Sequence, residues 1–264
     1  ENGTNGLVPA GTTGESPTLN HTEHEKVIEL CINEAKGKIP VIAGTGSNST
    51  EEAIALTKHA ESAGADGALV VTPYYNKPTQ EGLYQHYKTI NDNTGLPIII
   101  YNIPGRCVID MNIDTMARLF ELKNIAGVKD ATGDLNRLEQ SIKKLGPEFI
   151  QLTGEDGLAY EFNKRGGVGI ISVTANIAPK LCSDMQKFSK SESNNEVEEA
   201  QRIDSFLQPV HKALFIESNP APVKYAAKLL GLCDDAVRLP LVKIMDETKL
   251  KVKNSLISAN LLNE

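Results

Sequence analysis

The sequence predicts an α/β protein, a (β/α)₈ barrel that lacks its first strand and helix in this chain, followed by a helical region at the C-terminal end. Short apolar runs rich in β-branched residues begin roughly 20–35 residues apart, which is the spacing of successive strand–helix units. Amphipathic helical patterns with short links lie between these runs, as expected for a parallel sheet. The predicted strands are 6–10, 40–44, 68–72, 97–101, 125–129, 149–153 and 169–173.

Periodicity alone does not separate a closed barrel from an open, doubly wound sheet. The polar residues favour the barrel, because they follow many different strands instead of one switch point. The Gly44-Thr-Gly46 sequence lacks the spacing of a dinucleotide fingerprint. We expect an eighth strand, with its helix, to precede residue 1. The residues at or just past the strand ends are Thr12, Thr72, Tyr101, Lys129, Gly154 and Thr174.

Helix boundaries follow from capping signals. Thr22 with Glu25, and Ser49 with Glu52, have the spacing of capping boxes before apolar helical patterns. Glycines that end helices in a left-handed conformation are expected before the next strands. These are Gly37, Gly64, Gly95 and Gly146.

The pattern after Val173 contains helices only, predicted over 179–190, 196–216, 222–230 and 241–262. A polar break at 189–194 separates the first of these helices from the rest. We therefore predict a catalytic barrel over 1–192 and a C-terminal helical region over 193–264.

Composition narrows the class of protein. A net charge of −7 and a pI near 5.4 argue against nucleic acid and membrane surfaces as partners, although a basic pocket for an anionic metabolite remains allowed. The four scattered cysteines predict neither a zinc site nor a disulfide framework, which favours the cytoplasm. No apolar run is long enough to span a bilayer. The first residues do not resemble a signal peptide, yet they lack an initiator methionine and suit the remainder of a longer chain.

Lys129 is the candidate catalytic residue, because it ends a strand that otherwise reads as buried. Desolvation lowers the pKa of a lysine amine toward about 7–8, which makes a neutral nucleophile available for a Schiff base. A lysine that extends its ammonium group to the surface is the alternative.

Other polar residues near the strand ends suit the same chemistry. Tyr101 ends the strand before that of Lys129, so its phenol is placed to carry protons during imine formation. Arg106 lies on a loop near the same edge and suits carboxylate binding, although most loop arginines are simply solvated. The Gly11-Thr-Thr-Gly-Glu-Ser16 loop suits a bound carboxylate or an ordinary capped turn.

Five motifs together resemble the 4-hydroxy-tetrahydrodipicolinate synthase (dihydrodipicolinate synthase) family of pyruvate-dependent class I aldolases. The resemblance covers the whole chain. The Tyr101–Arg106 motif and the Pro73-Tyr-Tyr-Asn76 stretch favour the synthase branch over sialic-acid lyases and sugar-acid aldolases. Two departures are Cys107-Val108, where many members have Thr-Gly, and the absence of about 30 residues that carry the first strand and helix. The motifs are Gly11–Ser16, Val71–Asn76, Tyr101–Arg106, Gly127–Gly133 and Gly169–Asn176.

The resemblance implies roles for these residues in condensing pyruvate with aspartate 4-semialdehyde. Lys129 would form the imine with pyruvate, and Tyr101 would carry protons through a relay of Thr12 and Tyr75. In the family, Tyr75 comes from the neighbouring subunit, which implies a homo-oligomer of at least two chains. No metal or organic cofactor is implied. Pyruvate would contact Thr13 and the main chain of Gly154 and Ile171, and Arg106 would bind the semialdehyde carboxylate.

The resemblance also implies possible inhibition by L-lysine at the dimer interface. The residues have structural explanations as well, since Glu52 and both histidines lie near helix starts. Two other functions remain open: another pyruvate-dependent aldolase, and a pyruvate-binding sensor without turnover. The set matched to lysine binding is Ser16, His21, His24, Gly46, Asn48, Glu52 and Tyr74.

Overall fold

A curled, six-stranded parallel sheet lies at the centre of the larger part of the molecule, with strands in the order β1-β2-β3-β4-β5-β6. The structure is a computed structural model that describes residues 1–263. Six of the seven predicted runs are strands. They are β1 (Ile42–Gly44), β2 (Gly67–Val71), β3 (Ile98–Asn102), β4 (Ile125–Asp130), β5 (Ile150–Thr153) and β6 (Gly169–Ile170). Four of them lie within one residue of the predicted range, whereas β1 begins two residues later and β6 ends three residues earlier than predicted.

The first predicted run, 6–10, forms only an isolated parallel bridge between Leu7 and Val41. The segment still lies next to β1 and is hydrogen-bonded to it. The amides of Ile42 and Gly44 donate to the carbonyls of Leu7 and Pro9, each at 2.9 Å. Pro9 has no amide hydrogen to extend the ladder. Among residues 1–263 no backbone hydrogen bond joins this segment to β6, so the sheet is open as described.

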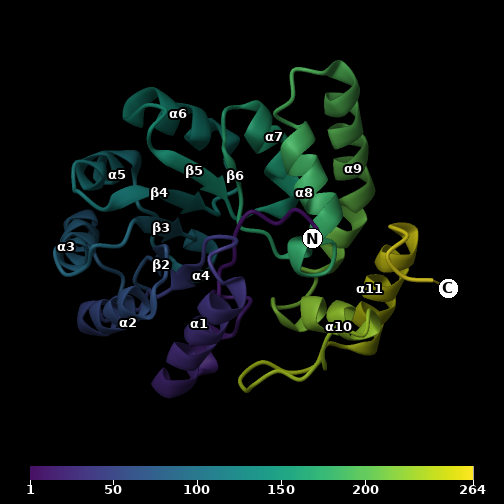
Figure 1. Ribbon diagram of the computed structural model, residues 1–264, viewed down its shortest axis with the longest axis horizontal. Coiled ribbons are helices and arrows are strands. Elements are labelled where there is room, and N and C mark those ends of the chain that lie inside the picture. Colours follow the sequence, from purple (N-terminus) through teal and green to yellow (C-terminus); the bar gives the residue numbers. More distant parts are fainter. Residues whose placement is uncertain (264) are drawn as a thin grey trace.

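Helices alternate with the strands and cover the outer face of the sheet (Figure 1). One predicted helix boundary and one predicted capping box need correction. The capping box of α1 is Asn20 with Glu23, not Thr22 with Glu25, because Asn20 is the residue with extended backbone before the helix. Ser49 does cap α2, accepting from the Glu52 amide, but the Glu52 side chain bonds elsewhere. These helices are α1 (His21–Ala35), α2 (Thr50–Ala63), α3 (Gln80–Asn91), α4 (Pro104–Cys107), α5 (Ile113–Phe120), α6 (Leu135–Leu145) and α7 (Ala159–Lys164).

The glycine caps are confirmed at two of four positions. Gly64 and Gly146 cap α2 and α6 with positive φ. Lys36, just before Gly37, is the left-handed cap of α1, and α3 ends at Asn91, well before Gly95. Gly95 is instead held by the Glu61 carboxylate, which accepts from its amide at 2.8 Å.

A bulge in β4 sets the direction of Lys129. Ile125 and Val128 both pack outward with the helices, although strict alternation would put them on opposite faces. The register explains this, since Ile98 pairs with Ile125 but Ile99 pairs with Gly127, leaving one extra residue in β4. A bulge re-aims the side chains that follow it. Lys129 is thereby turned to the inner face, opposite Val128.

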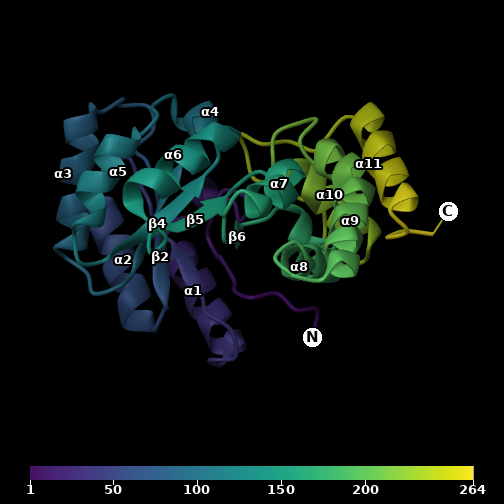
Figure 2. The same cartoon turned by 90° about the horizontal axis from the view of Figure 1, so that it is seen from above.

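The C-terminal helices pack side by side next to the sheet (Figure 2). α8 and α9 share one hydrophobic core across the predicted boundary at residue 192, and α9 to α11 enclose another. No helix within residues 1–263 combines the length and apolarity needed to cross a membrane. The helices are α8 (Pro179–Phe188), α9 (Asn194–Ala213), α10 (Ala221–Leu229) and α11 (Asp246–Ser258).

Ion pairs tie the C-terminal region to the loop after the first bridge. Lys224 of α10 contacts the Glu15 carboxylate at 2.6 Å, and the Arg238 amide donates to the same carboxylate at 3.0 Å. The Arg238 guanidinium also donates to Glu23 at 2.9 Å. The loop that contains Thr12 and Thr13 is therefore held from the far end of the chain.

Candidate active site

Lys129 and Tyr101 lie side by side on the inner face of the sheet. They are paired in register on β4 and β3, and the Lys129 Nζ atom is 4.0 Å from the centroid of the Tyr101 ring. Both side chains are buried, at 9% and 6% exposed. The predicted meeting of amine and phenol at neighbouring strand ends is thus present.

Burial changes the acid–base properties of both groups. Burial lowers the pKa of Lys129 to about 8, although the carboxylates of Asp156 and Glu155 oppose this shift. The amine is therefore partly unprotonated near neutral pH, as a nucleophile requires. Burial raises the pKa of Tyr101, while a hydrogen bond with Thr12 partly offsets the increase. The phenol stays protonated at neutral pH and can donate a proton to a reacting group.

Gly154 leaves room for the end of the lysine side chain. A Cβ atom at this position would lie 2.9 Å from the Ala131 Cβ and 3.0 Å from the Lys129 Cε. Both distances are shorter than ordinary carbon–carbon contacts. Gly154 therefore lies against Lys129, and Ile171 packs with the cluster that contains Tyr101 in the inner core.

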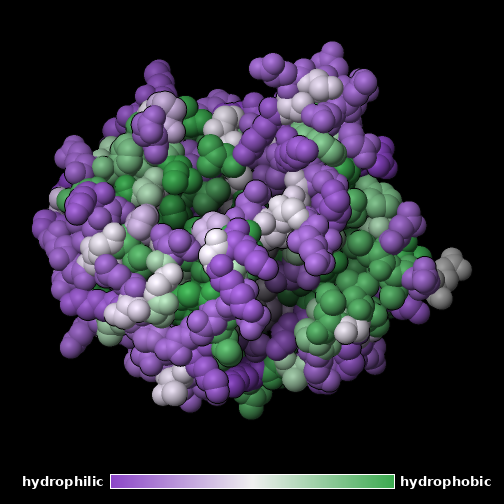
Figure 3. Space-filling model, viewed as in Figure 1, coloured by the Kyte–Doolittle hydropathy of each residue, from purple (hydrophilic) through white to green (hydrophobic). Residues whose placement is uncertain are grey.

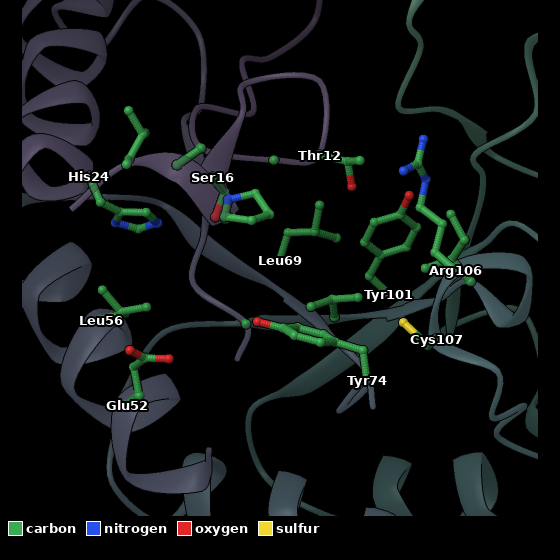
Figure 4. A pocket seen from close by; sticks show the side chains of 18 of the residues that line it. Thr12, Ser16, His24, Glu52, Leu56, Leu69, Tyr74, Tyr101, Arg106 and Cys107 are labelled. Atoms are coloured by element: carbon green, nitrogen blue, oxygen red, sulfur yellow. The ribbon is translucent and has the colours of Figure 1, made fainter. Parts of the chain in front are cut away.

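A cavity of about 320 Å³ opens beside Tyr101 (Figure 4), and Lys129 is not among its lining residues. Thr12, Tyr101 and Arg106 line one part of it, and the Thr12 hydroxyl points toward the Tyr101 hydroxyl. Arg106 lies in α4, directly after β3. These groups can hold a small carboxylate-bearing molecule next to Tyr101, whose ring lies 4.0 Å from the Lys129 amine.

Tyr75 is the predicted catalytic residue that this chain does not bring to the site. Its side chain is 88% exposed, its φ is +72°, and it is absent from the cavity lining. Its neighbour Tyr74 does line the cavity. The backbone turn points the two phenols in different directions, so only one of them serves the cavity of its own chain.

Six of the seven residues matched to lysine binding line the other part of the same cavity. Glu52 accepts a hydrogen bond from Ser47 and lies 2.8 Å from His21 Nε2, and these bonds lower the pKa of Glu52. Burial lowers the pKa of His24, so its ring is neutral. Asn48 lies just outside and donates to the Tyr74 carbonyl at 3.2 Å. The lining residues of this set are Ser16, His21, His24, Gly46, Glu52 and Tyr74.

Sequence reasoning missed three residues beside the site. Asp156 is buried after β5 and accepts from the Val173 amide at 2.9 Å and from the Ser172 hydroxyl, so it holds the segment after Ile171. The Glu155-Asp156 pair just past a strand end was the available signal. Cys107 lines the cavity next to Arg106. Asn219 contacts Thr13 from 206 positions away, which no local pattern indicates.

Comparisons with known proteins agree in sequence and fold. The sequence model of the "Dihydrodipicolinate synthetase family" matches residues 1–259. A protein of Pelagibacter ubique (strain HTCC1062) named 4-hydroxy-tetrahydrodipicolinate synthase is 75% identical over 261 residues, which cover 99% of this chain and 89% of that protein.

Two solved structures share this fold over nearly the whole chain. The chloride-inhibited dihydrodipicolinate synthase from Acinetobacter baumannii, complexed with pyruvate, has a TM-score of 0.95 and 48% identity, covering 99% of this chain and 89% of that one. The enzyme from Cyanidioschyzon merolae with lysine bound has a TM-score of 0.95 and 38% identity, covering 99% and 88%. The α/β barrel class, predicted from the strand spacing together with the polar residues at many strand ends, is confirmed.

Proposed function

The chain belongs to the dihydrodipicolinate synthetase family, and from this premise we propose that Lys129 forms an imine with pyruvate at the mouth of the sheet. The activity is that of a 4-hydroxy-tetrahydrodipicolinate synthase of lysine and diaminopimelate biosynthesis. The second substrate is L-aspartate 4-semialdehyde. The observation that supports this proposal best is a buried lysine with a pKa of about 8, paired in register with a buried tyrosine.

The reaction begins with the unprotonated Lys129 amine, which attacks the ketone carbon of pyruvate. Loss of water gives a protonated imine, which withdraws electrons so that a methyl proton leaves and an enamine forms. The enamine carbon then attacks the aldehyde carbon of the second substrate, forming the new carbon–carbon bond. The amino group of that substrate finally closes the ring and displaces Lys129, which restores the free enzyme.

The neighbouring residues have supporting roles. Tyr101 moves protons to and from the reacting oxygen, and the Thr12 hydroxyl beside it extends this relay. Thr13 and the main chain of Gly154 and Ile171 hold pyruvate. Arg106, which lines the cavity, binds the carboxylate of the semialdehyde.

Tyr75 completes the relay in the site of a second copy of the chain. This role is supported by its 88% exposure and by its position on the loop whose Tyr74 lines the cavity. A large exposed phenol on a surface loop is well suited to an interface. Hydrophobic side chains also gather on the surface over α10 and α11 (Figure 3). In this part of the sequence Leu232, Val242 and Leu250 are each more than half exposed. We therefore propose a homo-oligomer, at least a dimer.

L-Lysine is proposed as a regulatory ligand in the part of the cavity around Glu52. The Glu52 carboxylate suits the α-ammonium of lysine, and Tyr74 and Asn48 suit its carboxylate.

The four cysteines, all of them free thiols, support a cytoplasmic location.

Trapping the imine tests the central assignment. Incubation with pyruvate and borohydride should add one reduced adduct to the wild type, measured by intact mass. Lys129→Ala and Lys129→Arg should form none, because arginine stays protonated and is not a nucleophile. Lys190→Arg is the matched control, since Lys190 is another lysine whose pKa is lowered by desolvation, and it is not among the residues that line the cavity. Trapping in Lys129→Arg would refute the assignment, and trapping without aldehyde consumption would favour the sensor.

A further inference from the structure

Asn219 connects the two side chains that the proposed function assigns to substrate carboxylates. It lies between α9 and α10 and is 5% exposed. Its side-chain Nδ2 donates to the Thr13 Oγ1 at 2.9 Å. Its main-chain carbonyl accepts from the Arg106 Nη2 at 3.4 Å. One buried residue of the C-terminal region thus contacts both Thr13 and Arg106.

The direction of the bond to Thr13 decides what that hydroxyl can do. A threonine hydroxyl has one proton to donate and two lone pairs that accept. Because the Asn219 amide donates to the oxygen, the proton of Thr13 remains available for another acceptor. A carboxylate accepts only, so a hydroxyl held in this way is prepared to bind one.

We propose that Asn219 is a positioning residue for the reaction: its amide directs the Thr13 proton toward the pyruvate carboxylate, and its carbonyl fixes Arg106 for the second substrate. This inference rests on the proposed function of the site. Asn219 itself contacts neither Lys129 nor Tyr101 by any hydrogen bond in residues 1–263. Its effect is therefore on substrate binding and not on the chemical step.

Among residues 1–263 the Asn219 side chain makes no hydrogen bond besides the one to Thr13. The Asn219 Oδ1 atom is buried and has no hydrogen-bond partner in the described chain, so the hydrogen bond from Nδ2 to Thr13 is the one that fixes the side chain. Asn163 offers a matched comparison within the same molecule. It is also a buried asparagine with an unpaired Oδ1, but its Nδ2 donates to Gln186 and Ser189, both at 2.9 Å, away from the cavity.

Two substitutions separate positioning from simple packing. Asn219→Ala removes the donor, so we expect the KM for pyruvate to rise about three- to tenfold. Asn219→Asp keeps the shape but supplies only acceptors and a negative charge. The carboxylate introduced in this way would accept the hydrogen bond from the Thr13 hydroxyl, and its negative charge would repel the pyruvate carboxylate. The KM of this variant for pyruvate should therefore rise about 30- to 100-fold. In both variants kcat should stay within about twofold of the wild type, because Lys129 and Tyr101 are not touched.

Steady-state kinetics with both substrates, together with thermal melting, make the test. Asn163→Ala removes two hydrogen bonds and should lower the melting temperature at least as much as Asn219→Ala, while leaving the KM for pyruvate within about twofold. The KM for the semialdehyde should change little in Asn219→Ala, because the carbonyl that contacts Arg106 remains.

The inference is overturned if the KM for pyruvate of Asn219→Ala and Asn219→Asp equals that of the wild type. It is also overturned if the KM of Asn219→Asp is no higher than that of Asn219→Ala. Borohydride trapping on the wild type distinguishes this failure from failure of the proposed function. A wild type that traps pyruvate normally would leave the function standing and remove only the role of Asn219. A wild type that traps no adduct would remove both.

Discussion

Adding one methyl group at Gly154 should disable Lys129 without removing any functional group. In Gly154→Ala the new Cβ would lie 2.9 Å from the Ala131 Cβ and 3.0 Å from the Lys129 Cε. The Ala131 atom is fixed by its backbone, whereas the end of the lysine side chain can move. The substitution should therefore displace the amine by a few tenths of an ångström or more, and such misplacement of a reacting group costs up to about 100-fold in rate.

The loss of stability should be much smaller than the loss of reactivity. Overpacking of this kind costs about 1–3 kcal/mol, and each kcal/mol lowers the melting temperature of a protein of this size by roughly 2–4 °C. The assay is the initial rate of borohydride-trapped adduct at saturating pyruvate, with melting measured in parallel. Gly157→Ala, three residues further along the chain, is the control, because its Cβ would meet only the Gln208 side chain, at 3.4 Å. A Gly154→Ala variant that traps pyruvate at the wild-type rate would show that the contact with Lys129 does not matter.

Two further predictions concern charge. The rate of imine formation should rise with pH and level off above about 8, since only the unprotonated amine reacts and the pKa of Lys129 is about 8. Asp156→Asn should shift the midpoint of this pH profile to lower pH, because the Asp156 carboxylate raises the pKa of Lys129. The measurement is the trapping rate across the pH range, and a midpoint that stayed the same or rose would contradict the prediction. In an activity titration, L-lysine should inhibit the wild type, and Glu52→Ala should need at least about tenfold more lysine, because the carboxylate that pairs with the ligand is gone. Glu51→Ala, an exposed neighbour, should behave as the wild type, and an insensitive wild type would end the regulatory proposal.

Local patterns were sufficient for most of the fold. Apolar runs of four or five residues located six strands, because a buried parallel strand must be apolar on both faces. The helix starts were less predictable, since Asn20 and Thr22 are both acceptable caps and only the backbone decides between them. Gly95 was misjudged as a helix cap for a similar reason, because a glycine after a helix also suits a loop.

The site was predictable where it depends on strand ends and not where it depends on distant contacts. Tyr101 and Lys129 meet because consecutive parallel strands are neighbours. The inward direction of Lys129, however, depends on the extra residue in β4, and alternation counted from Ile125 would have turned it outward. The contact of Asn219 with Thr13 spans 206 positions and follows from tertiary packing alone.

The ion pairs between the two ends of the chain have a consequence for the order of assembly. The loop that carries Thr12 and Thr13 is made early, but Lys224 and Arg238, which hold its Glu15, follow it by more than 200 residues. Contacts between positions so distant in sequence form late, because the loss of chain entropy comes before the gain from the contact. A growing chain can therefore form the strand that bears Lys129 before its loop for pyruvate is fixed. We expect the ability to bind the substrate to arise only when Arg238 has been added and the C-terminal helices have packed.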